Sequence, residues 1–118
     1  MKLECPNKPS CISSLTRHAK RLVEPLFYTG DTRDVIRQLS AIVNAMPGGK
    51  VISVDTNSLQ AEFTSRWFGF VDDLDFMLDN NRINVRSMSR AGYFDFGKNR
   101  ACVEKIRKVF AQSGNATV

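Results

Sequence analysis

Between residues 51 and 90, apolar and polar side chains alternate along the chain, and short turn sequences interrupt the alternation. Because a period of two places successive side chains on opposite faces of a β-strand, this stretch predicts strands with one apolar face. Thr56-Asn57 and residues 79–82 are typical of the turns that close hairpins. The expected strands span residues 51–55, 58–64, 70–78 and 83–90.

The turns also determine which residues of the two hairpins lie opposite each other. In this register apolar side chains meet on one face of each hairpin, as a four-strand antiparallel meander requires. The expected pairs are Val54 with Leu59, Ile52 with Ala61, Phe76 with Val85, and Leu78 with Ile83.

Two other segments have the spacing of amphipathic helices. Residues 35–46 place their apolar side chains on an arc about 120° wide, behind a turn and N-cap at residues 30–32. Residues 98–112 predict a second helix, whose apolar arc includes Cys102, as a small core residue, and the polar Asn99. A short strand at residues 26–29 precedes the first helix.

The resulting order is strand, helix, four strands, helix. Two one-sided helices and a one-sided sheet can bury their apolar faces only against each other. We therefore predict an α+β two-layer sandwich, with both helices on one face of a mostly antiparallel sheet. At 118 residues we expect a single domain, 1–118, with an irregular segment at 1–25 and a frayed tail at 113–118.

The net charge of +5 is unevenly distributed. Residues 31–80 carry four basic and eight acidic side chains, whereas residues 81–118 carry eight basic and two acidic ones. The basic segments indicate either solvated surface charge or a patch for a phosphate, a lipid headgroup or an acidic protein. Nucleic acid is a less favoured partner, because the sequence has no aromatic platform or recognisable RNA-binding or DNA-binding module.

The chain has no apolar run of the roughly 18 residues that a transmembrane helix needs. Its first residues lack the apolar stretch of a secretory signal. As written, the sequence predicts a cytoplasmic protein, with export or membrane association expected if an upstream segment was removed.

The inner face of the predicted sheet becomes polar at one end. Alternation sends Ser87 and Ser89 inward, and Asp72 lies opposite Ser89 in the expected register. Asn99 from the last helix would meet them, near the loops that carry Arg66, Tyr93 and Asp95. Buried polar groups need partners, so this cluster predicts either a satisfied network that holds the helix or the polar end of a ligand pocket.

The outer face of the sheet alternates in charge. Asp75 is expected opposite Arg86, as a surface ion pair. Glu62 is expected opposite Asp73, a like-charge pair that could hold a cation.

Cys5 and Cys11 bracket a loop near the N-terminus. A disulfide, two free thiols and, least favoured, a metal site all fit this spacing, since the zinc-type C-x₂-C pattern is absent. The chain also lacks the common nucleophile, nucleotide and metalloprotease motifs, and its one histidine, His18, is expected on the surface. We therefore expect no cofactor, no metal and no catalytic residue.

Four separated motifs resemble the family called domain of unknown function 1499. They are Cys5-Pro6-Asn7-Lys8-Pro9-Ser10-Cys11, Thr64-Ser65-Arg66 with Phe70-Val71-Asp72-Asp73, Arg86-Ser87-Met88-Ser89-Arg90-Ala91-Gly92-Tyr93, and Asp95-Phe96-Gly97-Lys98-Asn99-Arg100. The resemblance implies an origin in bacteria or plastid-bearing organisms. Some members of the family carry membrane-anchoring or targeting segments upstream. The polar residues identified above lie inside these motifs.

The leading functional hypothesis is a non-enzymatic binding domain for a small anionic or polar ligand, or for an acidic protein or lipid surface. Arginines would supply charge-assisted contacts, and the serines, the tyrosine and the asparagine would orient the ligand. One alternative is a hydrolase or isomerase that uses Asp72 or Asp95 as acid or base. The other is a structural or assembly role. The expected ligand-binding residues are Arg66, Asp72, Arg86, Ser87, Ser89, Arg90, Tyr93, Asp95, Asn99 and Arg100.

Overall fold

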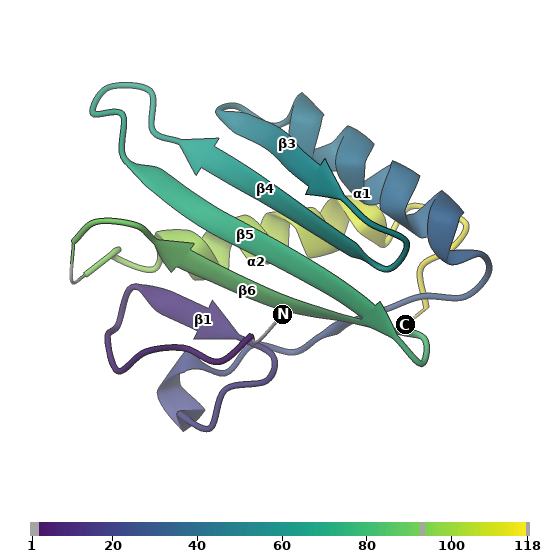
Figure 1. The fold of residues 1–118 in the computed structure, drawn as a ribbon, viewed down its shortest axis with the longest axis horizontal. Helices are drawn as coiled ribbons and strands as arrows, with labels where there is room; N and C mark the ends of the chain where they lie inside the picture. The colour runs from purple at the N-terminus through teal and green to yellow at the C-terminus, as the bar shows by residue number, and fades with distance from the viewer. Residues whose placement is uncertain (1–2, 93, 118) are drawn as a thin grey trace.

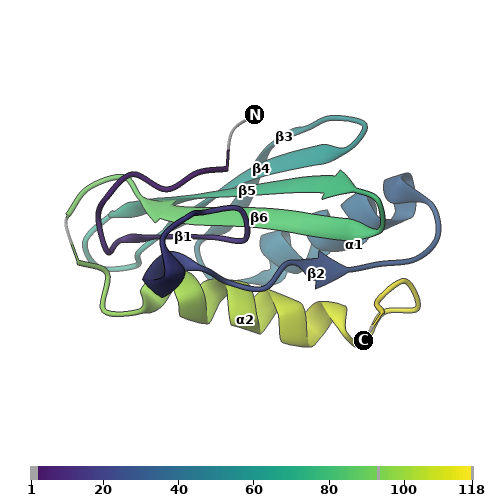
Figure 2. The same ribbon diagram turned by 90° about the horizontal axis from the view of Figure 1, so that it is seen from below.

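A six-stranded antiparallel sheet forms one layer of the protein, and two helices form the other (Figure 1). The structure is a computed structural model that describes residues 3–92 and 94–117. Seen along the plane of the sheet in Figure 2, both helices lie on the same side of it. The predicted α+β two-layer fold is confirmed. Its elements are β1 (Cys11–Ser13), the 3₁₀ turn η1 (Ala19–Arg21), β2 (Leu26–Phe27), α1 (Thr32–Ala45), β3 (Gly49–Val54), β4 (Ser58–Thr64), β5 (Val71–Asp79), β6 (Arg82–Ser89) and α2 (Lys98–Phe110).

The central hairpin, β5 with β6, has the predicted register. Phe76 lies opposite Val85, and Leu78 lies opposite Ile83. The turn between the strands places Asn80 and Asn81 at φ 51° and 66°. Two consecutive left-handed residues define the tight turn whose twist matches that of the flanking strands, and asparagine tolerates that conformation well.

The β3–β4 hairpin differs from the prediction at one point. Val54 pairs with Leu59 as expected, but a bulge between Val51 and Ser53 places Val51, not Ile52, opposite Ala61. Ile52 is therefore 48% exposed. An extra residue in one strand reverses the alternation beyond it, so a strict period of two assigns the wrong face there.

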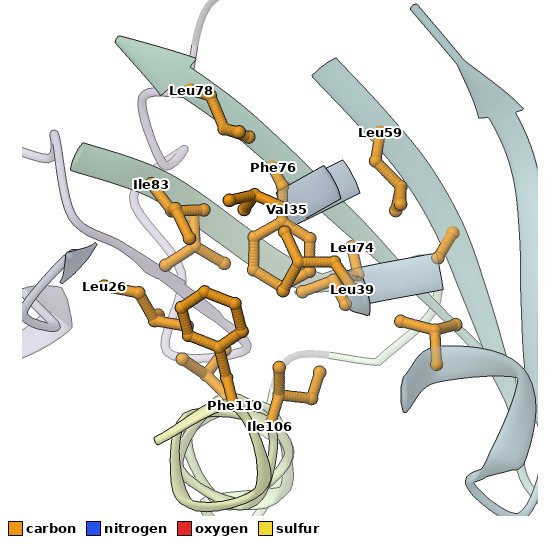
Figure 3. Close-up of a cluster of buried hydrophobic side chains, with 14 of the residues drawn as sticks. Leu26, Val35, Leu39, Leu59, Leu74, Phe76, Leu78, Ile83, Ile106 and Phe110 are labelled. Carbon is orange, nitrogen blue, oxygen red and sulfur yellow. The ribbon is translucent and has the colours of Figure 1, made fainter. Parts of the chain in front are cut away.

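The core lies between the sheet and the two helices (Figure 3). Asp31 caps α1 by accepting a hydrogen bond from the backbone N–H of Arg33. The last helix ends at Phe110 rather than at residue 112, and Val109 near its end is 41% exposed. The helices bury Val35, Ile36, Leu39, Val43, Val103, Ile106 and Phe110 against Leu59, Leu74, Phe76, Ile83 and Val85 of the sheet.

Within the described residues, both terminal segments contact the sheet. In the N-terminal segment, expected to be irregular, β1 adds an edge strand to β6, and a disulfide joins Cys5 to Cys11. The C-terminal tail, expected to fray, runs beside β2, where the backbone N–H of Thr117 donates to the carbonyl of Phe27. These contacts join segments far apart in the sequence, which local periodicity does not report.

Candidate functional site

Asn99 is the centre of a buried polar network at the start of α2. Its side chain is fully buried, and its Oδ1 accepts a hydrogen bond from Ser87 Oγ at 2.6 Å. Its Nδ2 donates to Ser89 Oγ at 3.0 Å and to Asp95 Oδ2 at 2.6 Å. Ser89 Oγ in turn donates to Asp72 Oδ1 at 2.8 Å. The structure thus brings together five of the residues that the sequence assigns to one site.

The loop closed by the disulfide covers this network. The carbonyl of Ser10 accepts from Asn99 Nδ2 at 3.2 Å and from the backbone N–H of Ser89 at 2.9 Å. Lys8 Nζ, from the same loop, donates to the carbonyl of Ser89 at 3.1 Å. The polar atoms of Asn99, Ser87 and Ser89 are therefore satisfied within the fold, and the network holds helix, sheet and loop together.

Asp95 stabilises the first turn of α2. Its carboxylate accepts from the backbone N–H groups of Gly97 and Asn99 at 2.8 and 3.2 Å. Burial acts to raise the pKa of Asp95, but the hydrogen bonds from Asn99 and the backbone outweigh it, and the pKa is lowered. An acid or base catalyst working near neutral pH needs a carboxyl group with the opposite shift.

Arg86 and Arg90 lie on the other face of the sheet. Arg86 Nη2 contacts Asp75 Oδ2 at 3.0 Å in the predicted register, but Asp75 is buried, so this is not the surface ion pair that the sequence predicted. Arg90 Nη2 lies 2.9 Å from Glu62 and 2.7 Å from Asp73, so an arginine occupies the place that the sequence suggested for a cation. Hydrogen bonds with Asp73 and then with Glu62 raise the pKa of Arg90. The protein's own carboxylates already engage both guanidinium groups.

The remaining expected residues are dispersed. Arg100 donates to the carbonyls of Leu22 and Lys20 at 3.0 and 3.2 Å and so anchors η1 to α2. Arg66 lies in the β4–β5 loop, with its guanidinium carbon 4.9 Å from the ring centroid of Trp67. Tyr93 lies outside the described residues. The nine expected residues that the structure describes therefore do not line a single pocket.

A groove of about 340 Å³ opens beside the network, between the end of α1, the β4–β5 side of the sheet and α2. We call it the lysine groove. Lys98 Nζ contacts Asp72 Oδ2 at 3.0 Å at its rim, whereas Lys105 makes no ion pair with any described residue. The residues that line the lysine groove are Met46, Pro47, Phe63, Thr64, Ser65, Asp72, Lys98, Ala101, Cys102 and Lys105.

Of the residues that line this groove, the sequence identified only Asp72 as a candidate site residue. Lys98, Cys102 and Lys105 follow the three-to-four-residue spacing of one helix face, and that spacing is the signal that could have found them. The groove appears only when this face of α2 meets the end of α1, which is a tertiary contact.

Cys102 is half-buried in the groove and packs against the core. Burial, and then the negative charge of Asp72, raise the pKa of its thiol to about 11. Near neutral pH Cys102 is therefore a thiol rather than the nucleophilic thiolate.

A larger cavity, of about 650 Å³, lies between η1 and α2. Its cationic side chains are already used to hold the N-terminal segment. Arg100 binds the carbonyls of η1, and Arg107 donates to the carbonyls of Pro25 and Glu24 at 2.9 and 2.5 Å. The lysine groove is the candidate site because Lys105 remains available for a ligand.

Fold and site together define a small α+β sandwich with an amphipathic groove beside a buried polar network. The family model described as Protein of unknown function (DUF1499) matches residues 3–110, and the chain belongs to this family. No curated protein and no solved structure matches the chain. Among the described residues, neither helix has the length and hydropathy needed to span a bilayer.

Proposed function

We propose that the protein is a non-enzymatic binding domain for a small anionic amphiphile, which occupies the lysine groove. The observation that carries this proposal is the combination of an apolar wall with two lysines on one face of α2. A volume of about 340 Å³ falls at the lower end of the range typical of small-molecule sites, about 300–1,000 Å³.

The two halves of such a ligand have different partners in the groove. Met46 and Phe63 offer apolar surface to an alkyl chain, and methionine adapts well to irregular ligands. Lys105 is exposed and free to bind a carboxylate or phosphate by charge-assisted hydrogen bonds. Asp72 holds Lys98 at the rim, so a second cation is positioned at little entropic cost.

The buried network supports this proposal indirectly. Asp72 connects to Asn99 through Ser89 and also pairs with Lys98, so the network orients one wall of the groove. Ser87, Ser89 and Asn99 thus serve the fold, and through it the groove, rather than touching the ligand.

Isothermal titration with octyl phosphate, octanol and inorganic phosphate tests the proposal. Octyl phosphate should bind more tightly than either compound that lacks one half of the amphiphile. Lys105→Ala should weaken octyl phosphate binding by about 10- to 100-fold, the equivalent of one charge-assisted hydrogen bond. Lys108→Ala, an exposed lysine of α2 outside the groove, is the matched control.

A second variant tests the apolar half of the groove. Ala101 is an exposed helix residue that lines the groove, so Ala101→Leu should fill it without disturbing the core. If octyl phosphate binds to both Ala101→Leu and Lys105→Ala as tightly as to the wild type, it does not occupy this groove.

A further inference from the structure

Large aromatic side chains are exposed at one end of the sheet. Trp67 and Phe68, in the β4–β5 loop, are 80% and 75% exposed, and Phe96, before α2, is fully exposed. We call this surface, residues 65–70 and 94–97, the aromatic tip. Apolar side chains grouped on a surface mark an interaction site, whereas scattered ones do not.

The two loops of the aromatic tip start from neighbouring strand ends because of the strand register. Asp72 at the start of β5 pairs with Ser89 at the end of β6, and the backbone N–H of Arg90 donates to the carbonyl of Val71 at 2.9 Å. Both loops project from the same end of the sheet (Figure 1). The hairpin turns after β3 and β5 lie at the opposite end.

The backbone holds these aromatic rings outward. Phe96 has φ 55°, a left-handed conformation that is strained for a bulky side chain. The Asp95 carboxylate, just before Phe96, accepts from the N–H groups of Gly97 and Asn99, which follow it, and so maintains this turn. In the other loop, the rings of Phe68 and Phe70 stack with centroids 5.7 Å apart. The exposure of Phe96 is therefore built into an ordered turn.

Cations surround the tip, and the neighbouring carboxylates are engaged. Arg66 lies over Trp67 and makes no ion pair with a described residue. Lys98 stands at the start of α2, and Lys8 reaches the same end of the sheet through the carbonyl of Ser89. Nearby, Asp72 binds Ser89 and Lys98, Asp73 binds Arg90, and Asp95 binds Asn99.

We infer that the aromatic tip docks the protein on an anionic lipid bilayer, with Trp67, Phe68 and Phe96 in the headgroup region and Arg66 and Lys98 near the lipid phosphates. Tryptophan is enriched at the membrane–water interface, and lysine and arginine are attracted to the negative surface of anionic lipids. Two narrow projecting loops suit insertion into a soft interface, whereas a stable protein pair buries about 800 Å² on each partner. This inference does not depend on the ligand proposed for the lysine groove.

Trp67 is the one tryptophan of the chain, so its fluorescence reports on the tip directly. We expect its emission to shift to shorter wavelength on titration with vesicles of phosphatidylcholine and phosphatidylglycerol in equal parts. Brominated lipid should quench it, and added salt should weaken the binding. No shift with these vesicles, or an equal shift with pure phosphatidylcholine vesicles, would overturn the inference.

Matched variants separate the tip from the rest of the surface. Phe68→Ala combined with Phe96→Ala should weaken vesicle binding by about ten-fold or more, and Arg66→Ala should weaken it and reduce its salt dependence. Val54→Ala and Arg82→Ala, exposed residues at the opposite end, should bind vesicles as the wild type does. Equal loss in these control variants would contradict a docking surface at the tip.

Two further outcomes are decisive. If the Trp67 emission shifts with protein concentration in the absence of vesicles, and sedimentation shows dimers, the partner of the aromatic tip is a second copy of the chain and not a bilayer. Ala101→Leu should abolish octyl phosphate binding and leave vesicle binding intact, so failure of the groove proposal and failure of the tip proposal are distinguishable.

Discussion

The side-chain oxygen Oδ1 of Asn99 accepts a hydrogen bond from Ser87 Oγ at 2.6 Å, and both residues are buried. This contact joins α2 to β6 through polar atoms inside an otherwise apolar interface. A buried amide that lost its partners would pay the full cost of its desolvation, so the contact favours one docking position of the helix over others.

Asn99→Ala should lower the free energy of unfolding by about 1–3 kcal/mol, because Ser87 and Ser89 would each lose a buried partner. Urea denaturation measures the change. Gln112→Ala, an exposed polar residue beyond the end of α2, is the control and should have little effect. Equal stability of Asn99→Ala and wild type would mean that the network does not hold the helix.

The stability of the protein should fall in acid partly through Asp95. Its pKa is lowered from 3.8 in the folded state, so its contribution is present above that value and is lost as the pH falls through the folded pKa. Asp95→Asn should therefore flatten the decline in stability between about pH 4 and pH 2. Melting temperatures of the wild type and Asp95→Asn, measured across this pH range, test this. Asp79→Asn is the control and should show the pH dependence of the wild type.

Arg90→Ala should destabilise the protein through repulsion between Glu62 and Asp73, which face each other across β4 and β5. The loss should be smaller than that of Asn99→Ala and should shrink as salt is added, because all three side chains are at least partly exposed to solvent. Adding Glu62→Gln to Arg90→Ala should restore stability. If neither salt nor Glu62→Gln restores the stability of Arg90→Ala, the loss comes from the packing of the Arg90 side chain and not from charge repulsion.

Replacing Cys5 and Cys11 by serine should lower the free energy of unfolding by about 2 kcal/mol, the entropic value for so short a loop. The same loop supplies the Ser10 carbonyl that accepts from Asn99 and Ser89. Reductant should destabilise the wild type to a similar extent and leave the double variant unchanged. Cys102→Ser is the control, and reductant should destabilise it as much as the wild type.

Alkylation of Cys102 by iodoacetamide should be slow near neutral pH and should accelerate toward about pH 11, following its thiolate fraction. Because the charge of Asp72 contributes to the raised pKa, Asp72→Asn should lower the pKa and speed the reaction. Asp79→Asn, distant from the groove, should react at the wild-type rate. Rapid reaction of the wild type at neutral pH would contradict the burial of the thiol.

By itself, the sequence determined the sandwich fold, the β5–β6 register and the pairing of Asp72 with Ser89 and of Asp75 with Arg86. These features follow from periods of two and of about 3.6 residues, which specify the face on which each side chain lies. The tertiary structure alone decided the bulge in β3, the attachment of the described terminal segments to the sheet, and the partners of Arg90 and Arg100. It also decided the lysine groove and the aromatic tip. Each of these depends on which elements and loops meet in space, and the periodicity of one segment carries no information about the segment that packs against it.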